Sequence, residues 1–250
     1  DPPTAPITSA NNVTYTFTDN INDSVVIQRS NIIVNGNGYT LQGSGSANGF
    51  YLSNVNKVIV QNTHIQNFSC GVHLSPYCKY NTVSGNTIID SYSDGVHLSP
   101  SCEHNTVSGN TIVGSYSDGV HLSPSCKYNT VSGNTIVDSY SDGVRLSPSC
   151  EENIVSGNTI TGSYSDGVHL SPSCKHNTIS ENTLAENKYG VYLYSSSNNK
   201  IYHNNFINNT NQAGLSDSEV NIWDDGYPSG GNYWSDYNGT DLYNLSLIHI

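Results

Sequence analysis

The middle of this chain repeats one 24-residue phrase almost without change. The phrase SYSDGVHLSPSCEHNTVSGNTIVG at 91–114 returns at 115–138, 139–162 and 163–186, and a diverged copy, NFSCGVHLSPYCKYNTVSGNTIID, precedes it at 67–90. Near-identical units at a fixed period indicate a repeat architecture, in which each unit buries its apolar face only by stacking on its neighbours. The repeat therefore constrains the fold far more tightly than it constrains the function.

Within one unit, apolar and polar residues alternate in short runs at 120–122, 129–131 and 134–136. Such runs between Gly, Pro, Ser and Asp predict short β-strands joined by turns, and no window shows the 3.6-residue period of a helix. About three strands per unit, stacked in parallel, predict an all-β fold. We expect a right-handed parallel β-helix, a β-solenoid of about seven coils of 22–24 residues with terminal caps.

The chain is expected to form a single domain with three parts. Residues 1–43 are predicted to be an N-terminal cap and first strands, and 44–209 the β-helix coils, with the near-identical copies at 67–186. The Gly-rich and aromatic-rich residues 210–250 are predicted to be a C-terminal cap that is truncated. Open solenoid ends expose unpaired strand edges, so either caps or end-to-end and edge-to-edge self-association are expected there.

Charge is sparse and mostly negative: 11% of residues are charged, Lys and Arg total 8, and the formal net charge is −12. Nucleic acid and anionic membranes attract proteins through clustered Lys and Arg, and this chain has no basic stripe. It also has no apolar stretch long enough for membrane insertion. The chain begins at Asp1 and contains no Met, which favours a mature secreted, cell-surface or periplasmic protein.

Residues 24 apart stack into columns in such a fold, and function is best sought along these columns. Two Asn columns are expected to be structural, with each amide hydrogen-bonded to the coils above and below. They are Asn81, Asn105, Asn129, Asn153 and Asn177, and Asn86, Asn110, Asn134, Asn158 and Asn182.

A third column consists of cysteines, with Cys70 set apart from it. Its members are Cys78, Cys102, Cys126, Cys150 and Cys174. We favour free thiols at a small inward corner; disulfides between coils and a thiolate metal site are the alternatives. Six cysteines allow fifteen pairings, so no pairing is assigned.

An outward column carries imidazoles, interrupted by Arg145. Its histidines are His73, His97, His121 and His169. Imidazole is a ligand for transition metals such as copper, which makes these residues candidate metal ligands. A column that also accepts Arg is typical of a solvated strand face, and we prefer that interpretation.

An acidic column at the Asp-Gly corner lies two residues after a column of tyrosines. The pairs are Tyr92 and Asp94, Tyr116 and Asp118, Tyr140 and Asp142, and Tyr164 and Asp166. Stacked carboxylates repel one another, and local Asx turns or a bound cation such as Ca²⁺ would relieve this. Carboxylates and aromatic rings also suit sugar hydroxyls and sugar faces, so this edge is the preferred carbohydrate-binding surface. The sequence does not require a cofactor. If an ion does bind at this edge, Ca²⁺ is the candidate.

A catalytic site needs one particular set of acid, base or nucleophilic residues, whereas identical coils repeat the same residues along the rod. The irregular coil contains Arg145, Glu151 and Glu152, which are the catalytic candidates if the protein is a lyase or hydrolase. The tail contains Trp223 and Trp234, which are predicted either to stack on sugars or to cap the open core of the last coil.

Three segments, YTFTDNINDSVVIQRSNIIVNGNGYTLQG, GVYLYSSSNNKIYHNNF and NIWDDGYPSGGNYWSDY, resemble the NosD-like family of archaeal and bacterial surface proteins. The resemblance covers residues 12 to about 241 and implies right-handed parallel β-helix repeats of the carbohydrate-binding and sugar-hydrolase type. The fold hosts lyases, epimerases, adhesins and a periplasmic copper-centre assembly factor, so it decides function poorly. The last residues, LSLIHI at 245–250, fit no coil and resemble a translated adapter at the end of a metagenomic reading frame.

The sequence therefore favours a β-helix that binds extracellular polysaccharide without catalysis. The alternatives are a polysaccharide lyase or glycoside hydrolase, a structural spacer or adhesin, and a protein that binds copper or calcium.

Overall fold

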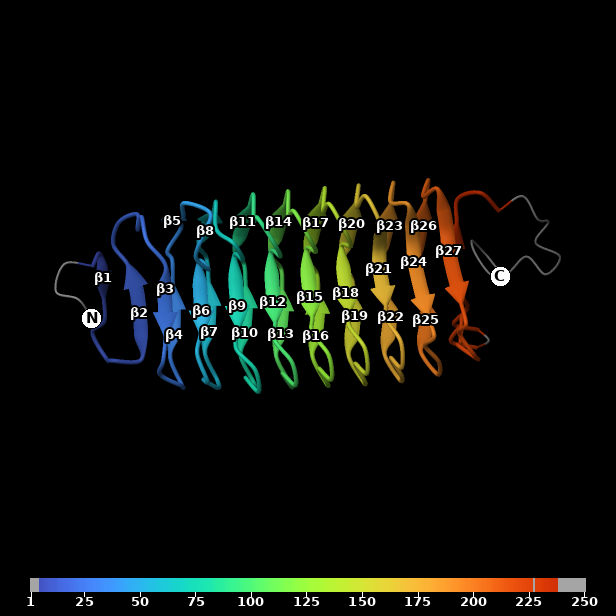
Figure 1. The fold of residues 1–250 in the computed structure, drawn as a ribbon, viewed down its shortest axis with the longest axis horizontal. Coiled ribbons are helices and arrows are strands. Elements are labelled where there is room, and N and C mark those ends of the chain that lie inside the picture. Colours follow the sequence, from blue (N-terminus) through green and yellow to red (C-terminus); the bar gives the residue numbers. More distant parts are fainter. Residues whose placement is uncertain (1–4, 227, 238–250) are drawn as a thin grey trace.

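Three parallel β-sheets run the length of the molecule, because each coil adds one strand to each sheet (Figure 1). In this computed structural model, residues 5–226 and 228–237 are described. The N-terminal and C-terminal strands lie at opposite ends of the rod. The prediction for residues 245–250 lies outside the described residues.

The first sheet contains, in spatial order, β1 (Ile7–Thr8), β2 (Thr14–Phe17), β4 (Ile33–Asn35), β7 (Ile59–Gln61), β10 (Thr82–Ser84), β13 (Thr106–Ser108), β16 (Thr130–Ser132), β19 (Ile154–Ser156), β22 (Thr178–Ser180) and β25 (Lys200–Tyr202). The second contains β5 (Thr40–Gln42), β8 (His64–Gln66), β11 (Thr87–Ile89), β14 (Thr111–Val113), β17 (Thr135–Val137), β20 (Thr159–Thr161), β23 (Thr183–Ala185), β26 (Asn205–Ile207) and β28 (Tyr233–Trp234). The third contains β3 (Val25–Ile27), β6 (Phe50–Leu52), β9 (Val72–Leu74), β12 (Val96–Leu98), β15 (Val120–Leu122), β18 (Val144–Leu146), β21 (Asp166–Leu170), β24 (Tyr189–Tyr194) and β27 (Asn211–Ser216).

The described residues form about nine coils, whereas the sequence predicted about seven. The difference arises at the ends, where strands outside the near-identical copies pair in the same register. Near the N-terminus, Val34 of β4 lies opposite Val60 of β7. The parallel β-helix itself is confirmed, and the described residues include no helix long and apolar enough to cross a membrane.

Equivalent residues stack directly on one another, as the 24-residue period requires. Val96 lies opposite Val120, and His97 lies opposite His121. Inward side chains form one continuous core; Val120 and Leu122, for example, are fully buried. Each strand therefore has an apolar face that packs in the core and an outer face whose side chains are accessible to a ligand.

The Asn columns form the buried amide ladders that the sequence predicted. Asn105 donates its side-chain amide to Asn129 Oδ1 in the next coil at 3.0 Å and to the Cys78 carbonyl at 2.9 Å. The six cysteines are free and buried. In the Cys column, the thiol of Cys150 donates to the Ser123 carbonyl of the preceding coil at 3.3 Å.

The two ends of the core are closed in different ways. At the N-terminal end, β1 pairs antiparallel with β2. At the other end, Trp234 stacks on Phe206 with ring centroids 4.4 Å apart, and Trp223 lies 6.0 Å from Trp234. Both tryptophans pack against the core, which is how a cap is built.

Candidate functional site: an aspartate–histidine groove

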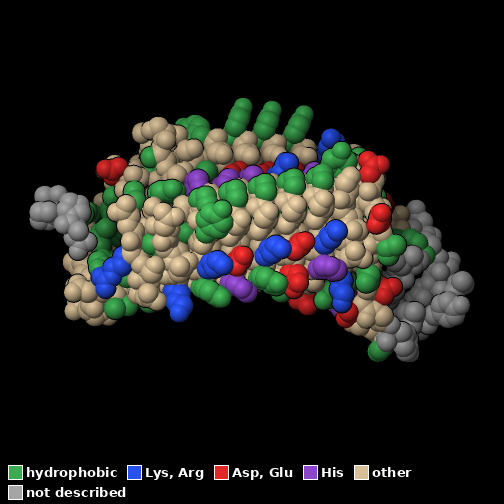
Figure 2. All heavy atoms as spheres, turned by 60° about the horizontal axis from the view of Figure 1, so that its bottom comes forward, with side chains coloured by type: hydrophobic (Ala, Val, Ile, Leu, Met, Phe, Trp, Pro, Cys, Tyr) green, Lys and Arg blue, Asp and Glu red, His purple; other side chains and the backbone are tan. Residues whose placement is uncertain are grey.

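A groove of about 590 Å³ lies at the corner where the chain passes from the second sheet to the third. Figure 2 shows histidine and acidic side chains in a row along a hollow, with hydrophobic side chains projecting above it. We call this cavity the histidine groove. It is lined by Ser46, Ala47, Asn48, Ser69, Cys70, His73, Ser93, Asp94, His97, Ser117 and His121.

The structure joins the Asp and His columns, which the sequence treated separately. The chain bends at Gly95, so the Asp94 carboxylate turns to the face that His97 occupies. Asp94 Oδ2 lies 2.7 Å from His97 Nδ1, and Asp166 Oδ2 lies 2.7 Å from His169 Nδ1. Gly95 is required here because a Cβ would lie 2.6 Å from the Gly119 carbonyl oxygen of the next coil.

The aspartates are buried, with exposed fractions of 1–3%. Each uses one oxygen to bind the backbone of the next coil: Oδ1 of Asp94, Asp118 and Asp142 accepts the N–H of the following column member at 3.0–3.1 Å. The other oxygen faces the imidazoles. These two interactions offset part of the repulsion between the stacked carboxylates. The bound cation considered from the sequence stays an untested prediction.

The pKa values of the ionisable groups in the Asp and His columns are shifted in opposite directions. Burial favours the neutral carboxyl, but hydrogen bonds from His121 and His97 outweigh it and lower the pKa of Asp94. Burial and the negative charge of Asp118 raise the pKa of Asp142 to about 6. Burial and the neighbouring His97 lower the pKa of His73 to about 4, so His73 is neutral at pH 7.

A serine column completes each unit, and sequence reasoning missed it. His97 Nε2 lies 3.0 Å from Ser123 Oγ, and His121 Nε2 lies 2.8 Å from Ser147 Oγ. The signal was present, since a Ser follows two positions after each His in the repeat, and the next coil's Ser reaches the imidazole. In the coil with Arg145 there is no imidazole, and Ser171 Oγ is buried without a hydrogen-bond partner.

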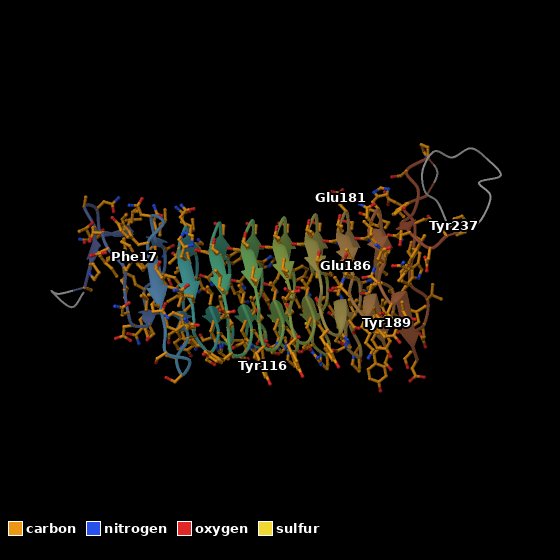
Figure 3. All side chains as sticks on the ribbon, turned by 90° about the horizontal axis from the view of Figure 1, so that it is seen from above. Phe17, Tyr116, Glu181, Glu186, Tyr189 and Tyr237 are labelled. Atoms are coloured by element: carbon orange, nitrogen blue, oxygen red, sulfur yellow. The ribbon has the colours of Figure 1, made fainter. Side chains whose placement is uncertain are left out.

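The tyrosine column forms an exposed wall beside the groove. The exposed fractions of Tyr92, Tyr116, Tyr140 and Tyr164 are 57–73%. Tyr116 and Tyr140 stack with ring centroids 5.0 Å apart and planes 3° apart, and Figure 3 shows Tyr116 projecting from the edge of the coils. Inner rings of the stack offer edges and hydroxyl groups to a ligand, because their faces are covered by neighbouring rings.

The structure does not bring the predicted catalytic residues together. The Arg145 guanidinium lies 3.4 Å from Asp142 Oδ2, in line with the His column. Glu151 is at another corner, where its carboxylate lies 2.7 Å from Lys127 Nζ. Glu152 occupies a turn there with φ of 54°. Trp223 and Trp234 lie at the C-terminal end of the core, outside the groove lining.

A second aromatic stack lies at that other corner and was also missed. His104 stacks between Tyr80 and Tyr128 with both centroid distances 4.9 Å. Beside it, Lys and Glu alternate along one column, and Lys79 contacts Glu103 at 2.7 Å. At this corner the charged side chains pair with one another and the aromatic rings stack on one another.

Three sets of donor atoms in the Asp and His columns are close enough to share a metal ion. Within each set the ligand atoms lie within 4.8 Å of one another. The sets are Cys70, Asp94 and His97; Asp94, Asp118 and His121; and Asp142, Asp166 and His169. Each contains an imidazole, which suits transition metals better than Ca²⁺, an ion that prefers six to eight oxygen ligands. Calcium binding stays an untested prediction.

Comparison with known protein families identifies the family to which this chain belongs. The family model described as periplasmic copper-binding protein (NosD) matches residues 30–239. The chain belongs to the NosD family. The family resemblance expected from the sequence is thereby confirmed. No curated protein matches this sequence significantly.

Solved structures with this fold include polysaccharide-acting enzymes. A mutant of the periplasmic alginate epimerase AlgG matches with TM-score 0.59 and 19% identity, over 70% of this chain and 44% of that one. An alginate lyase from Paenibacillus sp. gives 0.53 and 13%, over 87% of both chains. A mannuronan C-5 epimerase A-module of Azotobacter vinelandii gives 0.63 and 13%, over 81% and 60%. At these identities the likeness shows the fold alone, and the chain spans less than half of the AlgG mutant chain.

Proposed function

We propose that this secreted or periplasmic β-helix binds an extended polysaccharide along the histidine groove without catalysing its cleavage. The observation that carries the proposal is the groove itself, a polar floor of imidazoles and carboxylates beside an exposed wall of tyrosines. Both columns run along the rod, so a polymer lying along them meets recurring Asp, His and Tyr side chains in successive coils, apart from the breaks at Cys70 and Arg145. Repetition suits a repeating ligand.

The charge of the groove favours a neutral polysaccharide over a uronate. The net charge of the chain is −12, and the floor contains the ionised Asp94 carboxylate. Arg145 is the guanidinium within the column, and it faces Asp142 at 3.4 Å. A polyanion would meet repulsion that this single cation does not offset.

The comparisons support a polysaccharide ligand and an extracytoplasmic location. The names of the neighbours with this fold refer to alginate and mannuronan. The family description and the name of the epimerase AlgG both include the word periplasmic. Sugar hydroxyls need donors and acceptors in fixed positions, and imidazole, carboxylate and phenol groups supply both.

An enzyme acting on polysaccharide is the second candidate, and one observation favours it. Asp94, His97 and Ser123 form a hydrogen-bonded chain in which a carboxylate orients an imidazole, as in general-base catalysis. The Ser123 hydroxyl, however, lies on a residue with an exposed fraction of only 5%, so a polymer in the groove has little access to it. Binding without turnover is therefore the better supported function.

The test is a panel of neutral polysaccharides and uronates, scored for retention of the protein and for release of reducing or unsaturated ends. Retention on a neutral polymer without product supports the proposal. A double variant, Tyr116→Ala with Tyr140→Ala, should weaken retention. Tyr128→Ala is the matched control, because Tyr128 is an exposed, stacked tyrosine at the other corner. Product release would overturn the non-catalytic reading, and the absence of both signals would favour a spacer or adhesin.

A further inference from the structure

The groove contains one position that breaks the repeat. Cys70 stands 24 residues before Asp94, so it occupies the place that Asp fills in the next four coils. The break lies within the groove lining, where Cys70 is buried with an exposed fraction of 6%. Cys70 thus differs from the five other cysteines, which lie in the inward Cys column and do not line the groove.

We propose that Cys70, Asp94 and His97 form a binding site for a single copper or zinc ion. The three ligand atoms, one sulfur, one oxygen and one nitrogen, all lie within 4.8 Å of one another. Ligand bonds to such ions are roughly 2.0–2.3 Å long, so small side-chain rotations bring the three atoms onto one ion. Three protein ligands with one position facing the groove match an open, exchangeable metal site.

The donor set determines which ions the site prefers. Thiolate and imidazole together select copper and zinc, whereas calcium and magnesium prefer oxygen ligands alone. The set at Asp94, Asp118 and His121 lacks sulfur and shares Asp94, so filling the Cys70 site removes a ligand from it. The set at Asp142, Asp166 and His169 has the Arg145 guanidinium 3.4 Å from Asp142, and that cation opposes a second one.

The imidazole of His73 lies next to the site and is a second nitrogen donor beside that of His97. Its ring centroid is 4.7 Å from that of His97, and its Nδ1 lies 3.3 Å from the Asn48 amide. The Asn48 amide holds the ring in place beside the proposed ion. The family description names copper, and the donors of this chain fit such an ion. The site does not depend on whether the groove binds polysaccharide.

The experiment uses Co²⁺ as a spectroscopic probe with the reduced full chain, freed of any affinity tag, under anaerobic conditions. We expect a thiolate-to-Co²⁺ charge-transfer band that saturates at one equivalent, and its loss in Cys70→Ser. Cys174→Ser is the matched control, because Cys174 is a buried thiol of the Cys column; it should keep the band. Displacement of Co²⁺ by Cu⁺ or by Zn²⁺ at the lower concentration then identifies the preferred ion.

A second variant keeps the inference testable if Cys70→Ser alters the fold. His97→Gln should weaken Co²⁺ binding by about tenfold or more while leaving the sulfur in place, because even outer ligand partners contribute that much. Circular dichroism and the melting temperature check that each variant is folded. The proposal is overturned if wild type shows no band at millimolar Co²⁺, or if the band survives in Cys70→Ser.

Discussion

The Asn ladder allows a stability prediction that can be worked out bond by bond for Asn129→Ala. Asn129 Oδ1 accepts hydrogen bonds from the backbone N–H and the side-chain amide of Asn105, at 2.9 and 3.0 Å. Its own amide donates to the Cys102 carbonyl at 2.9 Å and to Asn153 Oδ1 at 3.1 Å. All four bonds are buried.

The cost follows from which partners keep another hydrogen bond. The Cys102 carbonyl still accepts from the Lys127 N–H at 3.1 Å, and Asn153 Oδ1 still accepts from the residue 129 N–H at 3.0 Å. The Asn105 N–H, in contrast, loses the acceptor it has in the native structure. One orphaned buried donor costs about 1–3 kcal/mol and each of the three other lost bonds about 0.5–1.5, so we expect a loss between about 2.5 and 7.5 kcal/mol.

The assay is urea unfolding of the full chain followed by circular dichroism, analysed as the free energy of unfolding in water. Asn205→Ala is the matched control, since Asn205 is an exposed residue of β26, and it should change stability by less than about 0.5 kcal/mol. A loss below about 1 kcal/mol for Asn129→Ala would refute the reasoning, because the ladder would then be dispensable.

Two further predictions concern pH and backbone contact. The folded pKa of His73 is about 4, below its ordinary 6.5, so the unfolded chain binds more protons between these values and stability should fall as pH drops through that window. His73→Asn should flatten this part of the profile of urea midpoint against pH, and an unchanged slope would contradict the assignment. Gly119→Ala should destabilise by several kcal/mol, because its Cβ would lie 2.6 Å from the Gly143 carbonyl oxygen. Gly109→Ala, with nothing within 4 Å and φ of 61°, should cost only about 1–2 kcal/mol in thermal or urea unfolding, and equal losses in the two variants would count against close coil contact.

The fold was predictable because the repeat fixes both period and register. Once residues 24 apart stack, the alternation at 120–122 decides which side chains face the core, and the inward Asn129 must bond to its neighbours. The terminal coils were undercounted because they keep only the alternation and not the phrase. Val34 and Leu41 are buried like their counterparts in the repeats, yet no copy of the repeated motif surrounds them.

The site was less predictable, because its contacts depend on the direction of side chains at a corner. Simple alternation places Asp94 and His97 on opposite faces, and only the bend at Gly95 brings them to 2.7 Å. The contact from His97 to Ser123 spans 26 residues, so reading down columns of 24 does not find it. The replacement of Asp by Cys70 could have been read from the aligned copies, but its meaning required knowing that the column lines a groove.

The two proposals use different parts of the chain, because polysaccharide binding relies on the repeated columns and metal binding relies on a position where the repeat is broken. In the uninterrupted coils, each His lies near the Asp of its own coil, but the distances differ: His97 Nδ1 is 2.7 Å from Asp94 Oδ2, and His121 Nδ1 is 3.6 Å from Asp118 Oδ2. At Cys70 the carboxylate column begins with a thiol, and at Arg145 the imidazole column is interrupted by a permanent cation. The groove lining between these breaks includes Asp94 and His121, and the same cavity holds the neutral imidazole of His73, the ionised carboxylate of Asp94 and the sulfur of Cys70. A ligand that needs only the repeated columns can bind anywhere along them, whereas a ligand that needs a sulfur in the groove can bind only at Cys70. Variants of Cys70 and of the tyrosine column therefore test the metal and polysaccharide hypotheses separately.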